Sequence, residues 1–205
     1  MKVTKWTTRV LQTPADNPLV VGIDQPGTRE FVTLELDTDE GLQGIGVTFF
    51  GGPLTPALRT AVDNLCELIV GEDPLQVEAV TDKLRLAAGS SGPEGIFTLA
   101  ISAIDIALWD IKGKALNQSV CSLLGGHRDR VITYASGALM RPMNLEYLAE
   151  AGPRLVEMGF KQMKTQMGAE PTAQREVARI RTLRDAIGPD IDLMCDINQL
   201  WNVNQ

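Results

Sequence analysis

The feature of the sequence that most constrains its fold is a change in the order of predicted elements near residue 125. Before this point, strand-like runs come first and helix-like stretches follow them. After it, short apolar runs alternate with longer amphipathic stretches. Clustered elements are typical of α+β domains, whereas a β-α-β-α-β order implies parallel strands joined by right-handed crossovers. The sequence therefore predicts two domains, residues 1–125 and residues 126–205, with different architectures.

The first domain is predicted to contain a three-stranded antiparallel sheet. Phe31–Leu36 is rich in strand formers and leads to Asp39-Glu40-Gly41, a turn signal after which Leu42–Phe50 returns as a second strand. Val3–Leu11 is expected to supply the third strand. The stretch Thr13–Thr28 holds three prolines and two glycines, so we expect a mobile loop there.

Three helices are expected to follow this sheet. The first two are Pro56–Val70, which stops at Gly71, and Leu75–Leu86, which is ended by the loop that begins at Gly89. The third has an apolar stripe and a separate alanine stripe, so it is expected to be buried on two sides and to end near Gly113. The two stripes are Phe97, Ile101, Ile104, Leu108 and Ile111, and Ala100, Ala103 and Ala107.

The second domain is predicted to contain three parallel strands, Val131–Tyr134, Phe160–Met167 and Ile191–Ile197. Each intervening helix has a predicted N-cap and a closing glycine: Asn144 and Gly159 for the first, Thr172 and Gly188 for the second. The apolar face of the second helix is expected to be Val177, Ile180, Leu183 and Ile187. Three strands cannot close a barrel, so a chain that ends at Gln205 is expected to be truncated.

Composition excludes several classes of function. A net charge of -7 argues against nucleic-acid binding, because little here could neutralise a row of phosphates. No apolar run approaches the roughly 20 residues that a membrane-spanning helix needs. The start of the chain lacks the apolar segment of a signal peptide, and three scattered cysteines make a poor disulfide framework. We therefore expect a soluble protein of the reducing cytoplasm.

Two strand ends carry candidate chemistry. Lys164 and Gln166 alternate with apolar or small residues, so they are expected to share one face near the end of their strand. A desolvated lysine there suits acid/base work or contact with a carboxylate, although a surface lysine on an edge strand remains the alternative. Asp196 and Asn198 are expected to share a face at the end of the next strand. Their oxygen atoms suit Mg²⁺, and helix capping is the alternative.

Other polar motifs are weaker candidates. His127 follows two glycines between the predicted domains and is expected to be a linker residue. Gly44-Ile45-Gly46 lies within a strand with no helix starting after it, which does not fit a dinucleotide-binding loop. Asp105 and Asp110 lie on the buried third helix, where capping or ion pairing is the better interpretation.

A family resemblance rests on the third helix. The segment Ala103-Ile104-Asp105-Ile106-Ala107-Leu108-Trp109-Asp110-Ile111-Lys112-Gly113-Lys114, followed by Leu123-Leu124-Gly125-Gly126, closely resembles the mandelate racemase/muconate lactonizing enzyme branch of the enolase superfamily. The resemblance covers residues 1–205 and implies an α+β capping domain followed by the first three β/α units of a TIM-type (β/α) barrel. It also implies a homo-oligomer for the full-length protein.

The resemblance implies roles for five residues. In the family, a Lys-x-Lys motif ends the second barrel strand, and its first lysine, which contacts the substrate carboxylate, is matched by Lys164. Its second lysine, the acid/base, is matched by Gln166, which cannot accept a proton at ordinary pH. Asp196 matches the first Mg²⁺ ligand, and Asn198 matches a substrate contact. Ser136, placed after the first strand, matches a further substrate contact.

Two segments would form the lid that sets specificity in the family. They are Val20-Val21-Gly22 and Phe49-Phe50-Gly51.

The family's chemistry is Mg²⁺-dependent abstraction of a proton α to a carboxylate, with stabilisation of an enediolate. A racemase needs a base on each face of the α-carbon, and Gln166 removes one of them. The leading hypothesis is therefore sugar-acid (aldonate or aldarate) dehydration by the full-length protein. Racemase, epimerase or cycloisomerase activity is the first alternative. The second is an inactive truncated fragment that acts as a binding module.

Overall fold

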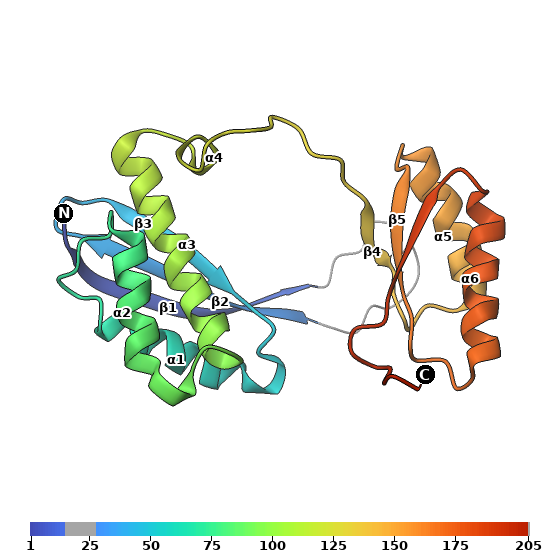
Figure 1. The fold of residues 1–205 in the computed structure, drawn as a ribbon, viewed down its shortest axis with the longest axis horizontal. Coiled ribbons are helices and arrows are strands. Elements are labelled where there is room, and N and C mark those ends of the chain that lie inside the picture. Colours follow the sequence, from blue (N-terminus) through green and yellow to red (C-terminus); the bar gives the residue numbers. More distant parts are fainter. Residues whose placement is uncertain (15–27, 205) are drawn as a thin grey trace. The chain divides into compact units, whose positions relative to one another are not determined.

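The computed structural model describes residues 1–14 and 28–204, which fall into two compact units that meet in sequence between Asp129 and Arg130. Each unit has its own three-stranded sheet and its own buried core (Figure 1). The first sheet is antiparallel and the second is parallel. The contrast predicted from the order of elements is therefore confirmed.

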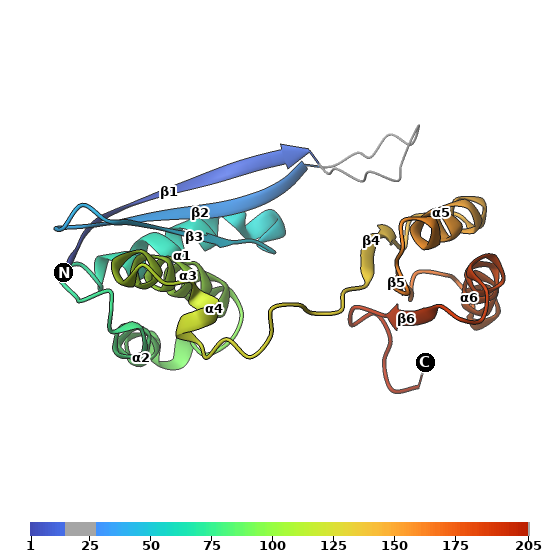
Figure 2. The same ribbon diagram turned by 90° about the horizontal axis from the view of Figure 1, so that it is seen from above.

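The sheet of the first unit consists of β1 (Val3–Pro14), β2 (Thr28–Thr38) and β3 (Gln43–Thr48), in the order β1-β2-β3. β1 and β2 run further than predicted, to Pro14 and from Thr28. What remains of the loop expected at Thr13–Thr28 lies outside the described residues. Figure 2 shows α1 (Thr55–Glu67), α2 (Val77–Ala88) and α3 (Ile96–Leu116) on one side of this sheet.

Short helices complete the first unit, namely η1 (Gly52–Leu54), η2 (Gly89–Ser91) and α4 (Val120–Leu123). α3 does not end near Gly113 as predicted but continues to Leu116. There Asn117 adopts the left-handed conformation, with φ of 50°, and stops the helix. Gly113 instead allows a close approach, because a Cβ on it would lie 3.0 Å from the carbonyl oxygen of Gln118. Among the described residues, no helix combines the length and apolar character needed to cross a bilayer.

The core of the first unit depends on a close approach of β3 to α3. The predicted alanine stripe of α3, Ala100, Ala103 and Ala107, is fully buried, as are Ile104 and Leu108 on its other stripe. The two glycines of β3 make this contact possible. A methyl group on Gly44 would overlap the carbonyl oxygen of Ala107, and one on Gly46 would overlap that of Ala103. The glycine pair is therefore a packing device.

The second unit consists of β4 (Ala135–Leu139), α5 (Leu145–Glu157), β5 (Gln162–Gln166), α6 (Ala173–Ile187) and β6 (Asp192–Asp196). The strands are parallel and lie in the order β4-β5-β6, so the two strands predicted to be neighbours are neighbours. The predicted N-caps are also confirmed. Asn144 Oδ1 accepts from the Tyr147 amide at 2.9 Å, and Thr172 Oγ1 accepts from the Arg175 amide at 3.3 Å.

Two predictions for the second unit were wrong. The first strand lies at Ala135–Leu139, because strands form where backbone pairing and a buried face coincide, and β4 pairs with β5 there. Val131 and Ile132 of the predicted run are 78% and 83% exposed. The inner face of α6 is also different. Leu183 and Ile187 are buried as expected, but Val177 is 45% exposed. Its place on the inner face is taken by two charged residues, Glu176 and Arg179.

Gly46→Ala is expected to destabilise the first unit by about 2 kcal/mol or more, because the added methyl must push β3 away from α3. The measurement is urea unfolding followed by tryptophan fluorescence, since Trp6 and Trp109 pack against this core. Ile45→Ala is the matched control. Ile45 lies between the two glycines with its side chain 54% exposed, so its loss should cost about 0.5 kcal/mol or less. Equal effects of the two variants would contradict the packing role of Gly46.

Candidate active site at the carboxyl ends of the parallel strands

The register between β5 and β6 brings three predicted site residues to one face of the sheet. Gln166 pairs with Asp196, and Lys164 pairs with Met194. Met163 and Thr165 alternate with these side chains and are fully buried. Since successive side chains point to opposite faces, Lys164, Gln166 and Asp196 lie on the less buried face. The predicted shared face of Lys164 and Gln166 is confirmed.

Lys164 and Asp196 form a direct ion pair. The Lys164 Nζ donates to Asp196 Oδ2 at 3.0 Å, and the two side chains are 24% and 28% exposed. The same Nζ lies 5.8 Å from the centroid of the Tyr134 ring, which is within the range of a cation–π contact. The sequence analysis did not identify Tyr134 as a site residue, because it placed Tyr134 only at the end of the predicted strand Val131–Tyr134. The pair holds the lysine beside the candidate metal ligand.

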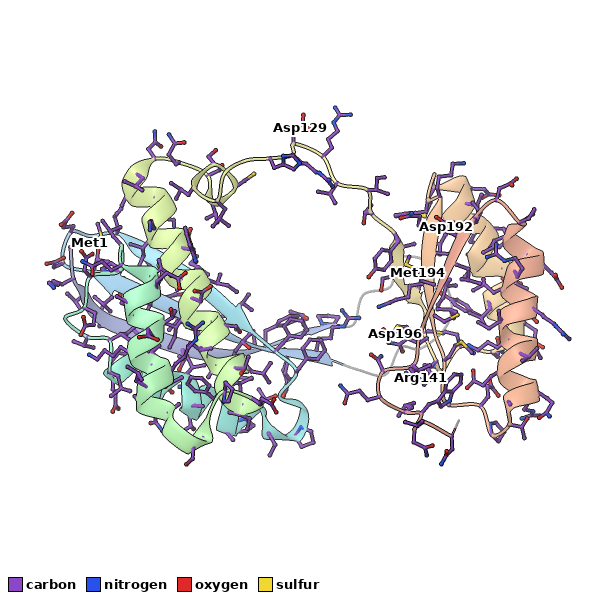
Figure 3. All side chains as sticks on the ribbon, viewed as in Figure 1. Met1, Asp129, Arg141, Asp192, Met194 and Asp196 are labelled. Carbon is purple, nitrogen blue, oxygen red and sulfur yellow. The ribbon has the colours of Figure 1, made fainter. Side chains whose placement is uncertain are left out.

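The surroundings of Asp196 keep it ionised. The hydrogen bond from Lys164 lowers the pKa of Asp196 below its ordinary value, and the bond from the Asn198 amide lowers it further. The charge of Arg141 acts in the same direction. Figure 3 shows Arg141 and Asp196 at the same end of the second unit, with Asp192 at the other end of β6. An ionised carboxylate at this end is what a hard divalent cation requires.

Asn198 does not continue the strand, contrary to the prediction that it shares a face with Asp196. β6 ends at Asp196, and Asn198 and Gln199 have φ of 45° and 64°. The physical reason is local, because the Asn198 amide donates to Asp196 Oδ1 at 3.0 Å. An aspartate that captures the amide two residues later starts a turn and ends the extended conformation. The exposed Asn198 is therefore placed by a turn.

Ser136 lies inside β4 and not after the first strand, because that strand begins later than predicted. Its side chain is exposed, and the next residue, Gly137, has φ of 99°. The pairing of β4 with β5 is irregular between Ala135 and Leu139. Within the described residues, no hydrogen bond joins Ser136 to Lys164 or Asp196.

Four charged residues that sequence reasoning missed lie beside Gln166. We call Arg141, Glu170, Glu176 and Arg179 the charged cluster; together with Gln166, Met167 and Ala169 they line one small gap. Glu176 and Arg179 are 4% and 2% exposed. The sequence held one signal for them, a glutamate and an arginine three residues apart on a helix, which places them on one face. The sequence analysis assigned the buried face of this helix to its apolar residues and did not consider these two charged residues.

Other candidates have structural explanations or lie outside the described residues. Asp110 accepts from the Ile45 amide at 2.8 Å and from Lys114 at 2.7 Å, as expected for ion pairing. Of the two lid segments, Val20-Val21-Gly22 lies outside the described residues. The other segment, Phe49-Phe50-Gly51, directly follows β3. The centroid of the Phe49 ring lies 5.5 Å from that of Phe31 and 4.1 Å from that of Phe50.

The fit of the site to Mg²⁺ rests on the donor atoms of Asp196. Mg²⁺ binds one or two protein carboxylates and keeps several waters, so this carboxylate fits as one ligand. Among the described residues, no group of three or more histidine, cysteine, aspartate or glutamate side chains is placed to hold a metal ion. A Mg²⁺ site that included Asp196 would therefore need further donors.

Lys164→Met is expected to raise the pKa of Asp196, because the hydrogen bond from Lys164 is the largest cause of its depression. A carboxyl whose pKa is depressed on folding stabilises the fold at neutral pH, and this stabilisation is lost as pH falls through the folded pKa. The variant should therefore lose less stability than the wild type on acidification. The measurement is carboxyl-detected NMR titration together with urea unfolding. Lys161→Met removes an exposed lysine just before β5 and should leave the titration of Asp196 unchanged.

Comparison with known proteins places the chain in a family. Residues 5–125 match the model described as the mandelate racemase / muconate lactonizing enzyme, N-terminal domain. Residues 146–205 match the model described as enolase C-terminal domain-like. The first match alone covers more than half of the chain.

Individual relatives agree with these matches. D-galactarolactone cycloisomerase of Agrobacterium fabrum is 33% identical over 100% of this chain and 54% of its own length. L-talarate/galactarate dehydratase of Salmonella typhimurium is 31% identical over 94% of this chain and 48% of its own. A crystal structure of a racemase from Streptomyces coelicolor with bound magnesium has a TM-score of 0.86 and 28% identity, covering 98% of this chain and 57% of that one.

The chain spans about half the length of the curated relatives that it matches. The features that carried the resemblance, the α3 segment and the two strand ends, lie within the matched regions. The chain belongs to the mandelate racemase/muconate lactonizing enzyme family of the enolase superfamily.

Proposed function

We propose that the full-length protein abstracts a proton α to a carboxylate with the help of Mg²⁺, and that its reaction is the dehydration of a sugar acid, an aldonate or an aldarate. The observation that carries this proposal is the grouping of Lys164, Gln166 and Asp196 on one face at the ends of β5 and β6. This face therefore carries the Lys164 ammonium group, the Gln166 carboxamide, which cannot take up a proton, and the ionised carboxylate of Asp196. Family membership supports the reaction class, since relatives include sugar-acid dehydratases, cycloisomerases and racemases.

The two units support an assignment of domains. We assign residues 1–125 to the capping domain and residues 126–205 to the first part of the barrel. In this assignment β4, β5 and β6 are the first three strands of a TIM-type barrel. Barrel active sites are built at the carboxyl ends of the strands, where Lys164, Gln166 and Asp196 lie.

Lys164 is assigned to the substrate carboxylate. Its ammonium group is held by Asp196 at 3.0 Å and lies near the face of Tyr134, so its position is set before substrate arrives. A fixed positive charge stabilises negative charge that develops on the substrate as the α-proton leaves. We assign Asn198 and Ser136 to substrate contacts; Asn198 is better placed, in the turn directly after Asp196.

Asp196 is assigned as a ligand of Mg²⁺, with its remaining ligands on parts of the protein beyond this chain. When bound, Mg²⁺ supplies positive charge next to the substrate carboxylate and so lowers the cost of removing the α-proton. Lys164 lies on the same face of the sheet as this carboxylate, with its ammonium group 3.0 Å from Asp196 Oδ2.

Gln166 limits the reaction to one face of the α-carbon. Its carboxamide donates and accepts hydrogen bonds but takes up no proton at ordinary pH. The α-proton must therefore leave on the opposite face, toward a base outside residues 1–205. A dehydratase works with one such base, whereas a racemase needs two.

Cycloisomerisation is the second candidate. A relative that matches 100% of the chain is a D-galactarolactone cycloisomerase, and a structural neighbour with 28% identity and a TM-score of 0.83 is a 3,6-anhydro-D-galactonate cycloisomerase. Product analysis separates the two reactions, because dehydration releases water to give a 2-keto acid and cycloisomerisation conserves mass.

In D₂O, the full-length protein is expected to turn over a sugar acid without inverting the α-carbon of the unreacted substrate. The reason is that Gln166 leaves no base on the Lys164 side. The measurement is NMR of the recovered substrate at partial conversion. Inversion at a rate comparable to turnover would contradict the proposal, because it requires a second base.

Asp196→Asn is expected to lower kcat/KM of the full-length protein by about 10³-fold or more, since it removes a carboxylate charge from the proposed Mg²⁺ site. Asp192→Asn is the matched control. Asp192 lies on β6 at the end remote from Asp196, and accepts from Gln162 at 3.1 Å, so activity should change less than threefold. Retention of Mg²⁺-dependent activity in the Asp196 variant would refute the assignment.

A further inference from the structure

The charged cluster beside Gln166 is costly to bury. Glu176 and Arg179 are almost inaccessible, and taking charged groups out of water carries a desolvation cost of several kcal/mol per ion. Burial lowers the pKa of Arg179, while Glu170 and Glu176 oppose that shift. Stability alone therefore does not account for charges at this place. Their hydrogen bonds indicate what they do instead.

The cluster ties together the loops that follow β4 and β5. Glu176 Oε1 accepts from the amides of Gly168 and Glu170, at 2.7 and 2.9 Å. Arg141 Nε donates to the carbonyl oxygen of Met167 at 2.7 Å. Arg179 donates to the carbonyl oxygens of Met143 and Met140, at 2.6 and 2.5 Å. The residues directly after Gln166 are thus held from both sides.

Three polar atoms of this network lack a hydrogen-bond partner within the described residues. Arg141 Nη2, a donor, and Glu176 Oε2, an acceptor, are buried without a partner in the described part of the chain. Arg179 Nε is a third such atom, and Glu170 lies 3.9 Å from the same guanidinium. The gap that they line has no room for a water molecule. Unpaired buried groups of this kind cost about 1–3 kcal/mol each.

Gln166 is the neutral polar side chain that lines the same gap, and it makes no hydrogen bond within the described residues. A carboxamide has one acceptor oxygen and one donor NH₂ group. These match two of the three unpartnered atoms, since Arg141 Nη2 needs an acceptor and Glu176 Oε2 needs a donor. A lysine could satisfy only Glu176, and a glutamate only Arg141.

We propose that Gln166 is a positioning residue whose carboxamide completes the charged cluster, accepting from Arg141 Nη2 and donating to Glu176 Oε2. Both hydrogen bonds require a change of side-chain rotamer at Gln166, which lines the same gap as its two proposed partners. These two hydrogen bonds would fix the position of the end of β5, and therefore also the position of Lys164, which lies two residues before Gln166. The proposal stands independently of the proposed dehydration, since it concerns contacts within this chain.

The test is a swap of the two partners. Amide hydrogen exchange of Gly168 and Glu170 reports on the network, because both amides donate to Glu176. Gln166→Glu sets two carboxylates against each other and should speed both exchange rates about tenfold or more. Adding Glu176→Gln reverses the donor and the acceptor. The double variant should return both rates to within about threefold of the wild type.

Two further variants act as controls. Gln166→Met keeps the length of the side chain and removes both hydrogen-bonding groups, so it should also speed exchange about tenfold. Gln162→Glu makes the same charge change on the same strand, beside Asp192 and away from the cluster, and should leave both rates unchanged. An unchanged rate in Gln166→Met would overturn the proposal and indicate that Arg141 and Glu176 pair directly. Failure of the double variant to restore protection would overturn it as well.

A measurement on the wild type keeps the test decisive if the variants do not fold. The side-chain NH₂ protons of Gln166 should exchange about tenfold more slowly than those of the exposed Gln199, because Gln166 is partly buried and its carboxamide is hydrogen-bonded in the proposed arrangement. Exchange as fast as that of Gln199 would show that the carboxamide does not reach Glu176.

Discussion

The parallel pairing of β5 with β6 is the constraint on which the site depends. Because Gln166 lies opposite Asp196, a shift of the register by one residue would turn Asp196 toward the helices and break its bond with Lys164. The buried side chains Met163 and Thr165 hold this register, since they fit only on the inner face. The chemistry at the strand ends thus rests on packing on the opposite side of the sheet.

The first unit uses a different device to fix its geometry. Residues of α3 that resemble the family segment are mainly packing residues, and the alanines among them are fully buried against a strand that carries two glycines. The backbones of β3 and α3 approach so closely that larger side chains would not fit between them. The alanines of α3 therefore require glycines on β3, and the glycines require small residues on α3. This explains why the Gly44-Ile45-Gly46 segment has no part in binding a cofactor: its glycines serve helix packing.

Charge placement in the second unit links its fold to its function. Lys164 with Asp196 occupies the less buried face, whereas Glu176 with Arg179 lies beneath the loops that follow the strands. Lys164 and Asp196 are the groups that we propose to contact the substrate and Mg²⁺. Glu176 holds the loop directly after Gln166, through the amides of Gly168 and Glu170. Replacing a family lysine by glutamine is thus compatible with a new structural role at the same position.

The sequence by itself determined the order of elements, the two architectures, both N-caps of the second unit and the shared face of Lys164 and Gln166, because periodicity and capping are local properties. The tertiary structure alone decided where the first parallel strand begins, how Asn198 is placed and which side chains of α6 are buried. Val131–Tyr134 has strand propensity, but only pairing with β5 selects Ala135–Leu139. Likewise, burial of Glu176 and Arg179 requires partners from loops distant in sequence, and no periodicity encodes those partners.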